Sequence, residues 1–346
     1  MSNNPWPTHF DDSPIDVEAV IQGAWAPGPY GPDDQRGTFN EVTPEKTAAA
    51  LARLDLTRPV KTYQLSEMLF NGFPAHADRK YEQTLSILGT EPPADFAGIC
   101  RSAKPIGGPR SICSLEERVS FTFNMGTKIN GLHHAGVGGR YYNGFKTVDI
   151  AQTWGTTKLG METQGAIVTR GVVVDVLGHK VAVGAEADLE ILSNGKPMLR
   201  EAYRISVEDI EAALDWEGVT DPIGPGDVVL LRSGWRELIE LDPKRYLAGR
   251  QSGIYLRECR YLAARRVAII GIDCWFFGAS MKNRWDIMQC HQELAGRYGI
   301  HVGEAVRSDP LADDGVYDFV FSFAAQNARG AVSSNAPLIG LGQPPG

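Results

Sequence analysis

Hydrophobic and polar residues alternate along the segment from position 118 to position 130. Large apolar side chains occupy the odd positions from 119 to 125, and polar or small residues occupy the even positions, among them Asn124, Lys128 and Asn130. A period of two is typical of a β-strand, because successive side chains of a strand point to opposite faces. We therefore expect one strand here, with Asn124, Lys128 and Asn130 on a single face.

The second half of the chain alternates between short apolar runs and amphipathic stretches. A nearly continuous β-branched run at 166–176 predicts a strand that is buried on both faces. Further strands are expected at 228–232, 267–272 and 316–323, and helices at 206–216, 256–265 and 285–298. Regular alternation of strands and helices indicates a mixed α/β fold.

Helix boundaries are marked by residues that cap helix ends. Ser206 with Asp209 forms a predicted capping box, and Gly218 follows as a stop signal. Thr43, with a proline directly after it, predicts the start of another helix that extends to about residue 54.

Glycine and proline are abundant, with 38 and 21 copies among 346 residues. Both residues interrupt regular elements, so many turns and long loops are expected. Residues 1–40 are rich in both and predict a loop-like arm, and the prolines of 55–118 leave only a short predicted strand near 60–65.

Charge and hydropathy exclude several classes of protein. The chain has 34 Lys and Arg against 42 Asp and Glu, a net charge of −8, so we expect no binding to nucleic acid or to anionic membranes. No apolar run approaches the roughly 20 residues needed to span a bilayer, and the N-terminus does not resemble a signal peptide. Five scattered cysteines without a CxxC pair indicate reduced thiols, and a cytoplasmic protein is the expectation.

Three clusters carry candidate chemistry. The first is 124–134, where four polar side chains converge, although spacing alone is more typical of an exposed polar edge strand. The second is His291 on the apolar face of a predicted helix, which by itself is more typical of a core histidine. The third is Asp273, at the carboxyl end of a predicted buried strand, where open α/β sheets place ligand crevices.

The segment 124–134, which reads NMGTKINGLHH, resembles the signature HxGTHxDxPxH of the cyclase-like metal-dependent hydrolases, a family that includes bacterial kynurenine formamidase, isatin hydrolase and trans-dienelactone hydrolase. Gly126, Thr127 and His134 match this signature. The similarity continues in the segments 31–40, 142–144, 170–175 and 225–235 and covers roughly residues 25–340.

This resemblance implies the family's fold and assembly. The fold is the swivelling β/β/α cyclase-like fold, a mixed sheet flanked by helices, here with an extended N-terminal arm. We expect residues 1–110 to form the arm and a wrapping segment and 111–340 to form the catalytic domain, within one structural unit. Members of the family are commonly homodimers or homotetramers.

In the family, the two motif histidines and the aspartate hold a divalent metal, often Zn or Mn, and the last histidine is the general acid/base. The three ligand positions are Asn124, Lys128 and Asn130 in this chain, whereas His134 is retained. A downstream His and Glu complete a second site in some members, and His291 and Glu304 match them.

These departures predict a site without a metal. Neutral amides are poor zinc ligands, and an ammonium offers no lone pair. We expect Lys128, balanced by Glu304, to replace the cation, with Asn130 stabilising an oxyanion and His134 transferring the proton, while His291 helps to orient the substrate or that base. The expected reaction is hydrolysis of a small cyclic amide, formamide or lactone.

The remaining expectations concern binding and alternatives. Candidate substrate-binding residues are Asn124, Thr127, Tyr142, Asp273 and Trp275, and the family favours small aromatic-derived substrates. Three alternatives stay open: a Zn or Mn hydrolase that uses His134, His291 and Glu304, a metal-free lyase or isomerase acting on a carbonyl compound, and a binding protein without activity. A neutral Lys128 that serves as a base or forms a Schiff base is a further variant of the metal-free reaction.

Overall fold

The computed structural model describes residues 5–76, 78–279 and 288–346. The chain forms two compact units, one made of Met1–Glu67 with Phe123–Gly346 and the other made of Met68–Thr122. The smaller unit is therefore an insertion between two parts of the larger one.

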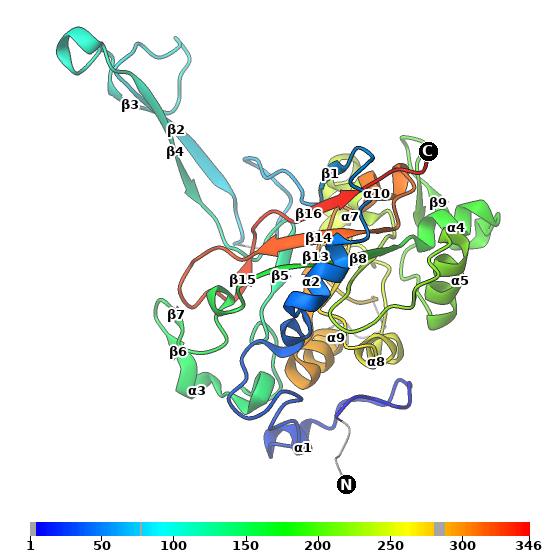
Figure 1. The fold of residues 1–346 in the computed structure, drawn as a ribbon. Coiled ribbons are helices and arrows are strands. Elements are labelled where there is room, and N and C mark those ends of the chain that lie inside the picture. Colours follow the sequence, from blue (N-terminus) through cyan, green and yellow to red (C-terminus); the bar gives the residue numbers. More distant parts are fainter. Residues whose placement is uncertain (1–4, 77, 280–287) are drawn as a thin grey trace. The chain divides into compact units, whose positions relative to one another are not determined.

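A mixed sheet organises the larger unit (Figure 1). Within the described residues it has nine strands, which lie in the order β1 (Lys61–Gln64), β16 (Ile339–Gly342), β14 (Asp318–Ala324), β8 (Ala166–Val174), β11 (Val228–Leu231), β12 (Ile269–Ile272), β13 (His301–Glu304), β5 (Lys128–Asn130) and β15 (Ser333–Ser334). Two short hairpins accompany it, β6 (Ala151–Gln152) with β7 (Gly155–Thr156) and β9 (Leu189–Ile191) with β10 (Pro197–Leu199).

Four neighbouring strands, β8, β11, β12 and β13, run parallel to one another, and the strands on either side of them run antiparallel. Every residue of β11, β12 and β13 is buried, which agrees with their apolar sequences because parallel strands are covered on both faces. The mixed α/β fold expected from the sequence is confirmed, and so are the strands at 166–176, 228–232, 267–272 and 316–323.

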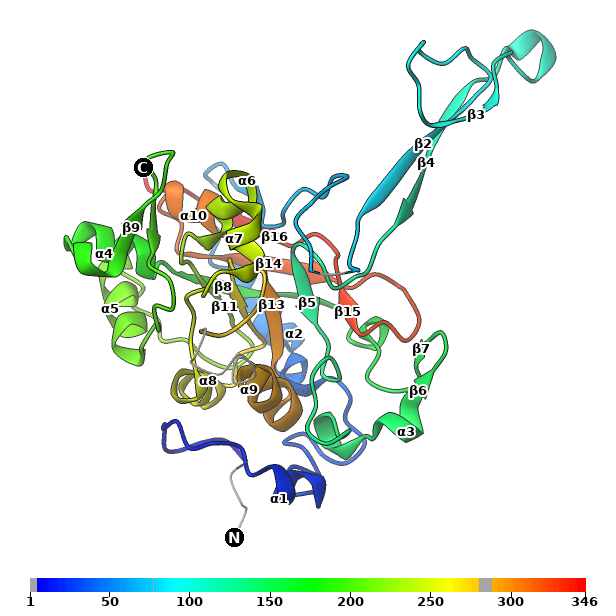
Figure 2. The ribbon, with the colours of Figure 1, turned by 180° about the vertical axis from the view of Figure 1, so that it is seen from behind.

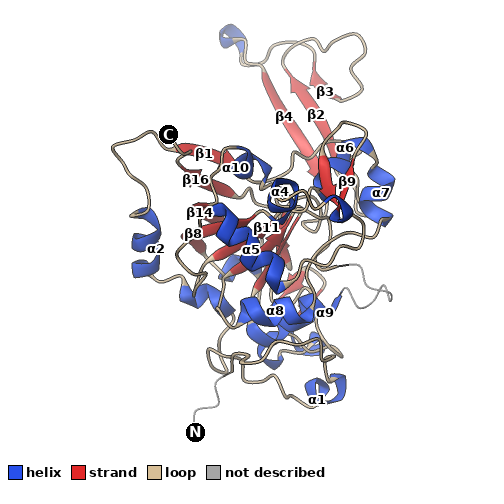
Figure 3. Cartoon of the chain, turned by 90° about the vertical axis from the view of Figure 1, so that its right-hand side faces the viewer, coloured by secondary structure: helices blue, strands red, loops and turns tan. Residues whose placement is uncertain are grey.

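Helices flank this sheet, and Figure 3 shows α5 crossing in front of it and α8 and α9 beyond its lower end. The helices are α1 (Val17–Ile21), α2 (Pro44–Leu51), α3 (Thr147–Ile150), α4 (Val176–Ala182), α5 (Val207–Glu217), α6 (Leu238–Leu241), α7 (Pro243–Ala248), α8 (Leu256–Ala263), α9 (Met288–His291) and α10 (Asp309–Asp313), with short 3₁₀ turns between several of them. In the described part of the chain, no helix is long and apolar enough to cross a membrane.

The predicted helix caps are confirmed. The Thr43 side chain accepts the backbone N–H of Lys46 at the start of α2. Ser206 and Asp209 form the capping box of α5, and Gly218 ends this helix with a positive φ of 71°. Local capping rules therefore locate both helices correctly.

The helix expected at 285–298 has a different form. Residues 285–287 lie outside the described residues, α9 ends at His291, and the chain continues as a π-helix over Gln292–Tyr298. Gly299 ends this π-helix in the left-handed region. The wider π-turn follows His291 directly, and such turns frequently lie at functional sites.

The single strand expected at 118–130 is wrong. The structure has two separate strands, β4 (Ser114–Ser120) in the smaller unit and β5 in the larger one, with bends between them. Gly126 adopts a positive φ of 57° within these bends. A left-handed residue interrupts the extended backbone, so Asn124 precedes the strand and does not share its alternation.

The smaller unit, Met68–Thr122, is a three-stranded sheet with the order β3-β2-β4, seen in Figure 2 as the cyan strands that carry these labels. β2 (Glu82–Leu88) pairs with β3 (Ile99–Ser102) in parallel and with β4 in antiparallel orientation. All seven residues of β4 are exposed. This unit thus has little core of its own.

Candidate active site

The candidate site is built on the face of β5 that carries Lys128 and Asn130. Because strand side chains alternate, Ile129 points the other way and is part of the hydrophobic core. Glu304 on β13 pairs in register with Lys128, so the two side chains lie on the same face. The register of two short antiparallel strands therefore brings the two charges together.

Lys128 and Glu304 form a buried ion pair. Lys128 Nζ lies 2.8 Å from Glu304 Oε2, and the side chains are 4% and 2% exposed. The ammonium also donates to the backbone carbonyl of Trp275 at 3.2 Å. Two charges taken out of water are tolerated only when each finds further polar partners, and both of these do.

Glu304 is the centre of the cluster, because each of its two carboxylate oxygens has two polar neighbours. Oε2 accepts from Lys128 and from the Asn130 amide nitrogen at 2.8 Å. Oε1 accepts the backbone N–H of Phe277 at 2.8 Å and lies 3.3 Å from His291 Nε2. Although burial opposes ionisation, the Lys128 ammonium and His291 hold the pKa of Glu304 well below its usual range, so this side chain is a carboxylate.

Two histidines border the cluster. His291, at the end of α9, is 1% exposed, and its ring centroid lies 5.0 Å from that of Phe276 and 5.9 Å from that of His134. His134 is only partly buried and follows a turn in which its backbone N–H donates to the carbonyl of Gly131. The accessible histidine therefore lies beside the buried one.

The structure thus brings together Lys128, Asn130, His291 and Glu304 through direct contacts, with His134 next to His291. The first four come from β5, α9 and β13, and His134 lies in the turn that follows β5. Trp275 belongs to the same neighbourhood, since its backbone carbonyl binds Lys128 and its ring packs edge-on against Phe276 at 5.3 Å.

Other predicted substrate-binding residues lie on the bend before β5, on β5's N-terminal side and beside the N-terminal arm. Thr127 accepts the backbone N–H of Glu67 at 2.8 Å and donates to the carbonyl of Ala305, which ties β5 to neighbouring loops. The Tyr142 hydroxyl donates to Asp34 Oδ2 at 2.7 Å and anchors the N-terminal arm. Asn124 is half-buried in the bend before β5.

Asp273 binds the loop that follows β11. Its carboxylate accepts the backbone N–H groups of Ser233 at 3.0 Å and of Gly234 at 2.6 Å, and the Ser233 hydroxyl as well. Burial raises the pKa of Asp273 to about 6, which these hydrogen bonds oppose. The oxygens of Asp273 are therefore occupied by the protein itself.

Two groups of the cluster had no signal in the sequence. One is the backbone N–H of Phe277, which binds Glu304. The other is the hydroxyl of Ser333, which donates to Asn130 Oδ1 at 3.1 Å from β15, a strand of only two residues. A strand of two residues shows no alternation of polar and apolar positions. A sequence motif consists of side-chain types, so it does not indicate which backbone N–H groups donate.

A divalent metal does not fit the three side chains at the positions of the family's ligands. Two are neutral amides, and the third is an ammonium that has no lone pair and already lies 2.8 Å from the Glu304 carboxylate. A second cation beside Lys128 would be repelled. Across residues 5–76, 78–279 and 288–346, no group of three or more His, Cys, Asp or Glu side chains is arranged to hold a metal ion.

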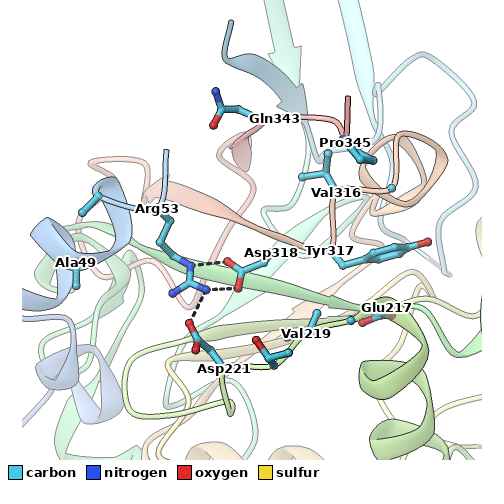
Figure 4. Close-up of a pocket in the computed structure, with 14 residues that line it drawn as sticks. Ala49, Arg53, Glu217, Val219, Asp221, Val316, Tyr317, Asp318, Gln343 and Pro345 are labelled. Carbon is cyan, nitrogen blue, oxygen red and sulfur yellow. Dashed lines mark hydrogen bonds and ion pairs between the residues drawn. The ribbon is translucent and has the colours of Figure 1, made fainter. Parts of the chain in front are cut away.

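A cavity of about 710 Å³ lies elsewhere in the larger unit and contains none of the residues of the cluster. Figure 4 shows Arg53 on its wall, pointing toward Asp318 and Asp221. Arg53 donates to Asp318 at 2.7 Å and to Asp221 at 2.9 Å, so these three side chains of the wall bind one another.

Comparisons with known proteins agree with this fold and motif. Residues 34–279 match the sequence model of the Cyclase family, described as "Putative cyclase". No curated protein sequence matches the chain.

Solved structures extend the match over nearly the whole chain. The crystal structure of a protein described as a novel cyclase is 26% identical with a TM-score of 0.73, and the match covers 90% of this chain and 98% of that protein. Isatin hydrolase A from Ralstonia solanacearum is 17% identical with a TM-score of 0.56, covering 86% of this chain and 95% of that one. Isatin hydrolase A from Labrenzia aggregata, bound to benzyl benzoate, is 14% identical with a TM-score of 0.55, covering 85% and 98%. The family match spans well over half of the chain, so this protein belongs to the Cyclase family.

Proposed function

We propose that this protein is a metal-independent hydrolase of small cyclic amides, formamides or lactones. One observation carries the proposal: the Lys128 ammonium lies 2.8 Å from Glu304, at the position where the family's motif has a metal ligand. The chain has thus exchanged a ligand for a fixed positive charge, and has kept His134, His291 and Glu304 around it.

In this proposal Lys128 and Asn130 are the donors that stabilise a developing oxyanion. When water adds to a carbonyl carbon, the carbonyl oxygen becomes negative, and a preorganised cation and amide donor in a dry site stabilise that charge. Lys128 and Asn130 lie side by side on β5 and are 3% and 1% exposed. They are held by Glu304, so they do not need to reorganise during the reaction.

His134 is the proton-transfer group in this proposal. It takes a proton from the attacking water as the carbon–oxygen bond forms, and returns that proton to the leaving nitrogen or oxygen as the carbon–nitrogen or carbon–oxygen bond breaks. His134 is more accessible than His291, which supports contact with the substrate. In this proposal His291 and Glu304 stay in fixed positions, so the electrostatic potential that they produce at His134 stays constant during the reaction.

Aromatic rings beside the cluster support a small aromatic-derived substrate. Trp275 and Phe276 are half-buried and pack edge-on at 5.3 Å, next to the ring of His291. Partly exposed aromatic rings beside buried polar groups are typical of walls that bind planar ligands.

The test is turnover of a panel of isatin-like cyclic amides, N-formyl amines and lactones by the purified protein and by His134→Ala. We expect the variant to lose at least about 100-fold in kcat with little change in folding. Equal rates of the two proteins would remove His134 from this role. A product that has not gained one water would instead indicate a lyase or isomerase, and no turnover together with tight substrate binding would indicate a binding protein.

The question of the metal is decided on the same preparation. We expect dialysis against a chelator to leave turnover unchanged and elemental analysis to find less than about 0.1 equivalents of Zn or Mn. A stoichiometric metal that activity requires would contradict the proposal and favour the alternative site at His134, His291 and Glu304.

A further inference from the structure

Ser333 lies directly opposite Asn130 in the sheet. β15 pairs with β5 so that Ser333 and Asn130 are in register, and their side chains are on the same face. Both residues are nearly inaccessible, at 3% and 1% exposure. The neighbouring Ser334 faces the other way, and its hydroxyl binds Gln326 instead. Of the two serines on β15, only Ser333 contacts the cluster through its side chain.

The carboxylate of Glu304 selects one orientation of the Asn130 amide, and the hydroxyl of Ser333 holds the amide in place. The hydroxyl donates to Oδ1 at 3.1 Å, and the amide nitrogen donates to Glu304 Oε2 at 2.8 Å. A carboxylate can only accept, so a flipped amide would set its oxygen against Glu304, which is costly in a buried site. The hydroxyl can donate or accept, so its contribution is to fix the position of the amide.

This orientation determines what His291 meets. The amide nitrogen of Asn130 lies 3.4 Å from His291 Nε2, and Glu304 Oε1 lies 3.3 Å from the same atom. A displaced amide would therefore change the contacts of His291 as well as those of Glu304.

We propose that Ser333 is a positioning residue of the active site: its hydroxyl locks the Asn130 amide so that the amide N–H groups face Glu304 and His291. The catalytic part of this inference rests on the proposed hydrolase function, whereas the structural part does not. Ser333 acts through Asn130 and does not itself touch the substrate.

The kinetic test compares Ser333→Ala and Ser333→Thr with a matched control, Ser334→Ala, which removes a hydroxyl from the same strand on the opposite face. For a substrate found in the panel, Ser333→Ala is expected to lower kcat about tenfold with KM changed less than about twofold. Ser333→Thr keeps the donor and is expected to restore kcat to within about threefold, and Ser334→Ala is expected to leave kcat unchanged.

A second readout needs no substrate. The two side-chain N–H resonances of Asn130 are followed by ¹H–¹⁵N NMR and are assigned by their absence in Asn130→Ala. Freeing the amide in Ser333→Ala is expected to speed the exchange of these protons with water at least about tenfold, with wild-type behaviour in Ser333→Thr and Ser334→Ala.

These readouts separate the possible failures. If no carbonyl compound is hydrolysed, the proposed function fails, and the exchange of the Asn130 amide protons still decides the role of Ser333. A folded Ser333→Ala protein with unchanged kcat and unchanged exchange of these protons would overturn the inference. Should that variant not fold, Ser333→Cys, with a weaker donor, is expected to give an intermediate exchange rate, and a wild-type rate would overturn the inference equally.

Discussion

At the scale of single residues, the cluster around Glu304 combines residues from several family positions. Lys128 and His134 occupy motif positions, His291 and Glu304 match the family's downstream pair, and the structure brings all four to neighbouring positions. Ser333 carries no motif, since its role depends on the register of a strand of two residues. A family motif identifies residues that relatives share, whereas the partner of a residue across a sheet is known only from the register of the strands.

The Lys128–Glu304 pair is the first residue-level prediction. Lys128→Met leaves a carboxylate buried without its main partner, so we expect unfolding free energy to fall by about 3–5 kcal/mol and activity to be lost. The double variant Lys128→Met/Glu304→Gln removes that uncompensated charge and is expected to recover most of the stability but none of the activity. Chemical denaturation measures the first quantity and turnover the second.

Lys128→Arg provides the control for charge alone, since it retains a cation with a different shape. We expect a folded protein with activity at least about tenfold below the wild type, because the planar guanidinium does not reproduce the contacts to Glu304 and to the carbonyl of Trp275. Full activity of Lys128→Met would show that the positive charge has no part in the reaction.

At the scale of elements, prediction succeeded where a pattern was long or capped. The central strands and α5 follow their periodicity and caps closely, because burial on both faces and the Ser206 capping box each leave a local signature. The expected strand at 118–130 failed because its alternation continues across bends that join two separate units. A π-helix over Gln292–Tyr298 also has no periodicity that distinguishes it from an α-helix.

The end of α5 provides a prediction of pH dependence. Glu217 is the last residue of this helix, its Oε1 accepts the backbone N–H of Asp175, and its Oε2 has no hydrogen-bond partner among the described residues. Burial, opposed by this hydrogen bond, raises the pKa of Glu217 to about 9 from a usual value near 4.5. The folded protein therefore keeps a proton that the unfolded chain loses between these values, so stability falls as the pH rises through this window.

Glu217→Gln removes this titration while retaining an acceptor for Asp175. We expect its melting temperature relative to the wild type to increase from pH 5 to pH 8, by about 3 °C at the higher pH. Differential scanning fluorimetry across this range measures it, with Asp215→Asn, an exposed site on the same helix, as the control. A difference that is constant with pH would contradict the assignment.

At the scale of the whole molecule, the smaller unit exposes more apolar surface than its size explains. Among the described residues of this unit, eight large apolar side chains are at least 38% exposed: Met68, Phe70, Leu85, Ile99, Ile106, Ile112, Leu115 and Val119. Leu85, Leu115 and Val119 share one face of the sheet, since Leu115 and Val119 alternate on β4 and the register places Leu85 between them. Apolar patches of this kind mark interaction sites.

A second copy of the chain is the partner that we propose for this face. A three-stranded sheet with a fully exposed edge strand is marginally stable by itself, and pairing two copies would cover Leu115 and Val119 on both.

The double variant Leu115→Lys/Val119→Lys is expected to convert a dimer or tetramer to a smaller species in light scattering coupled to size-exclusion chromatography. Leu56→Lys is the matched control, because Leu56 is 81% exposed but belongs to the larger unit. A monomeric wild type, or an assembly unaffected by the double variant, would refute this interface, and activity retained in the dissociated variant would show that each copy holds a complete site around Glu304.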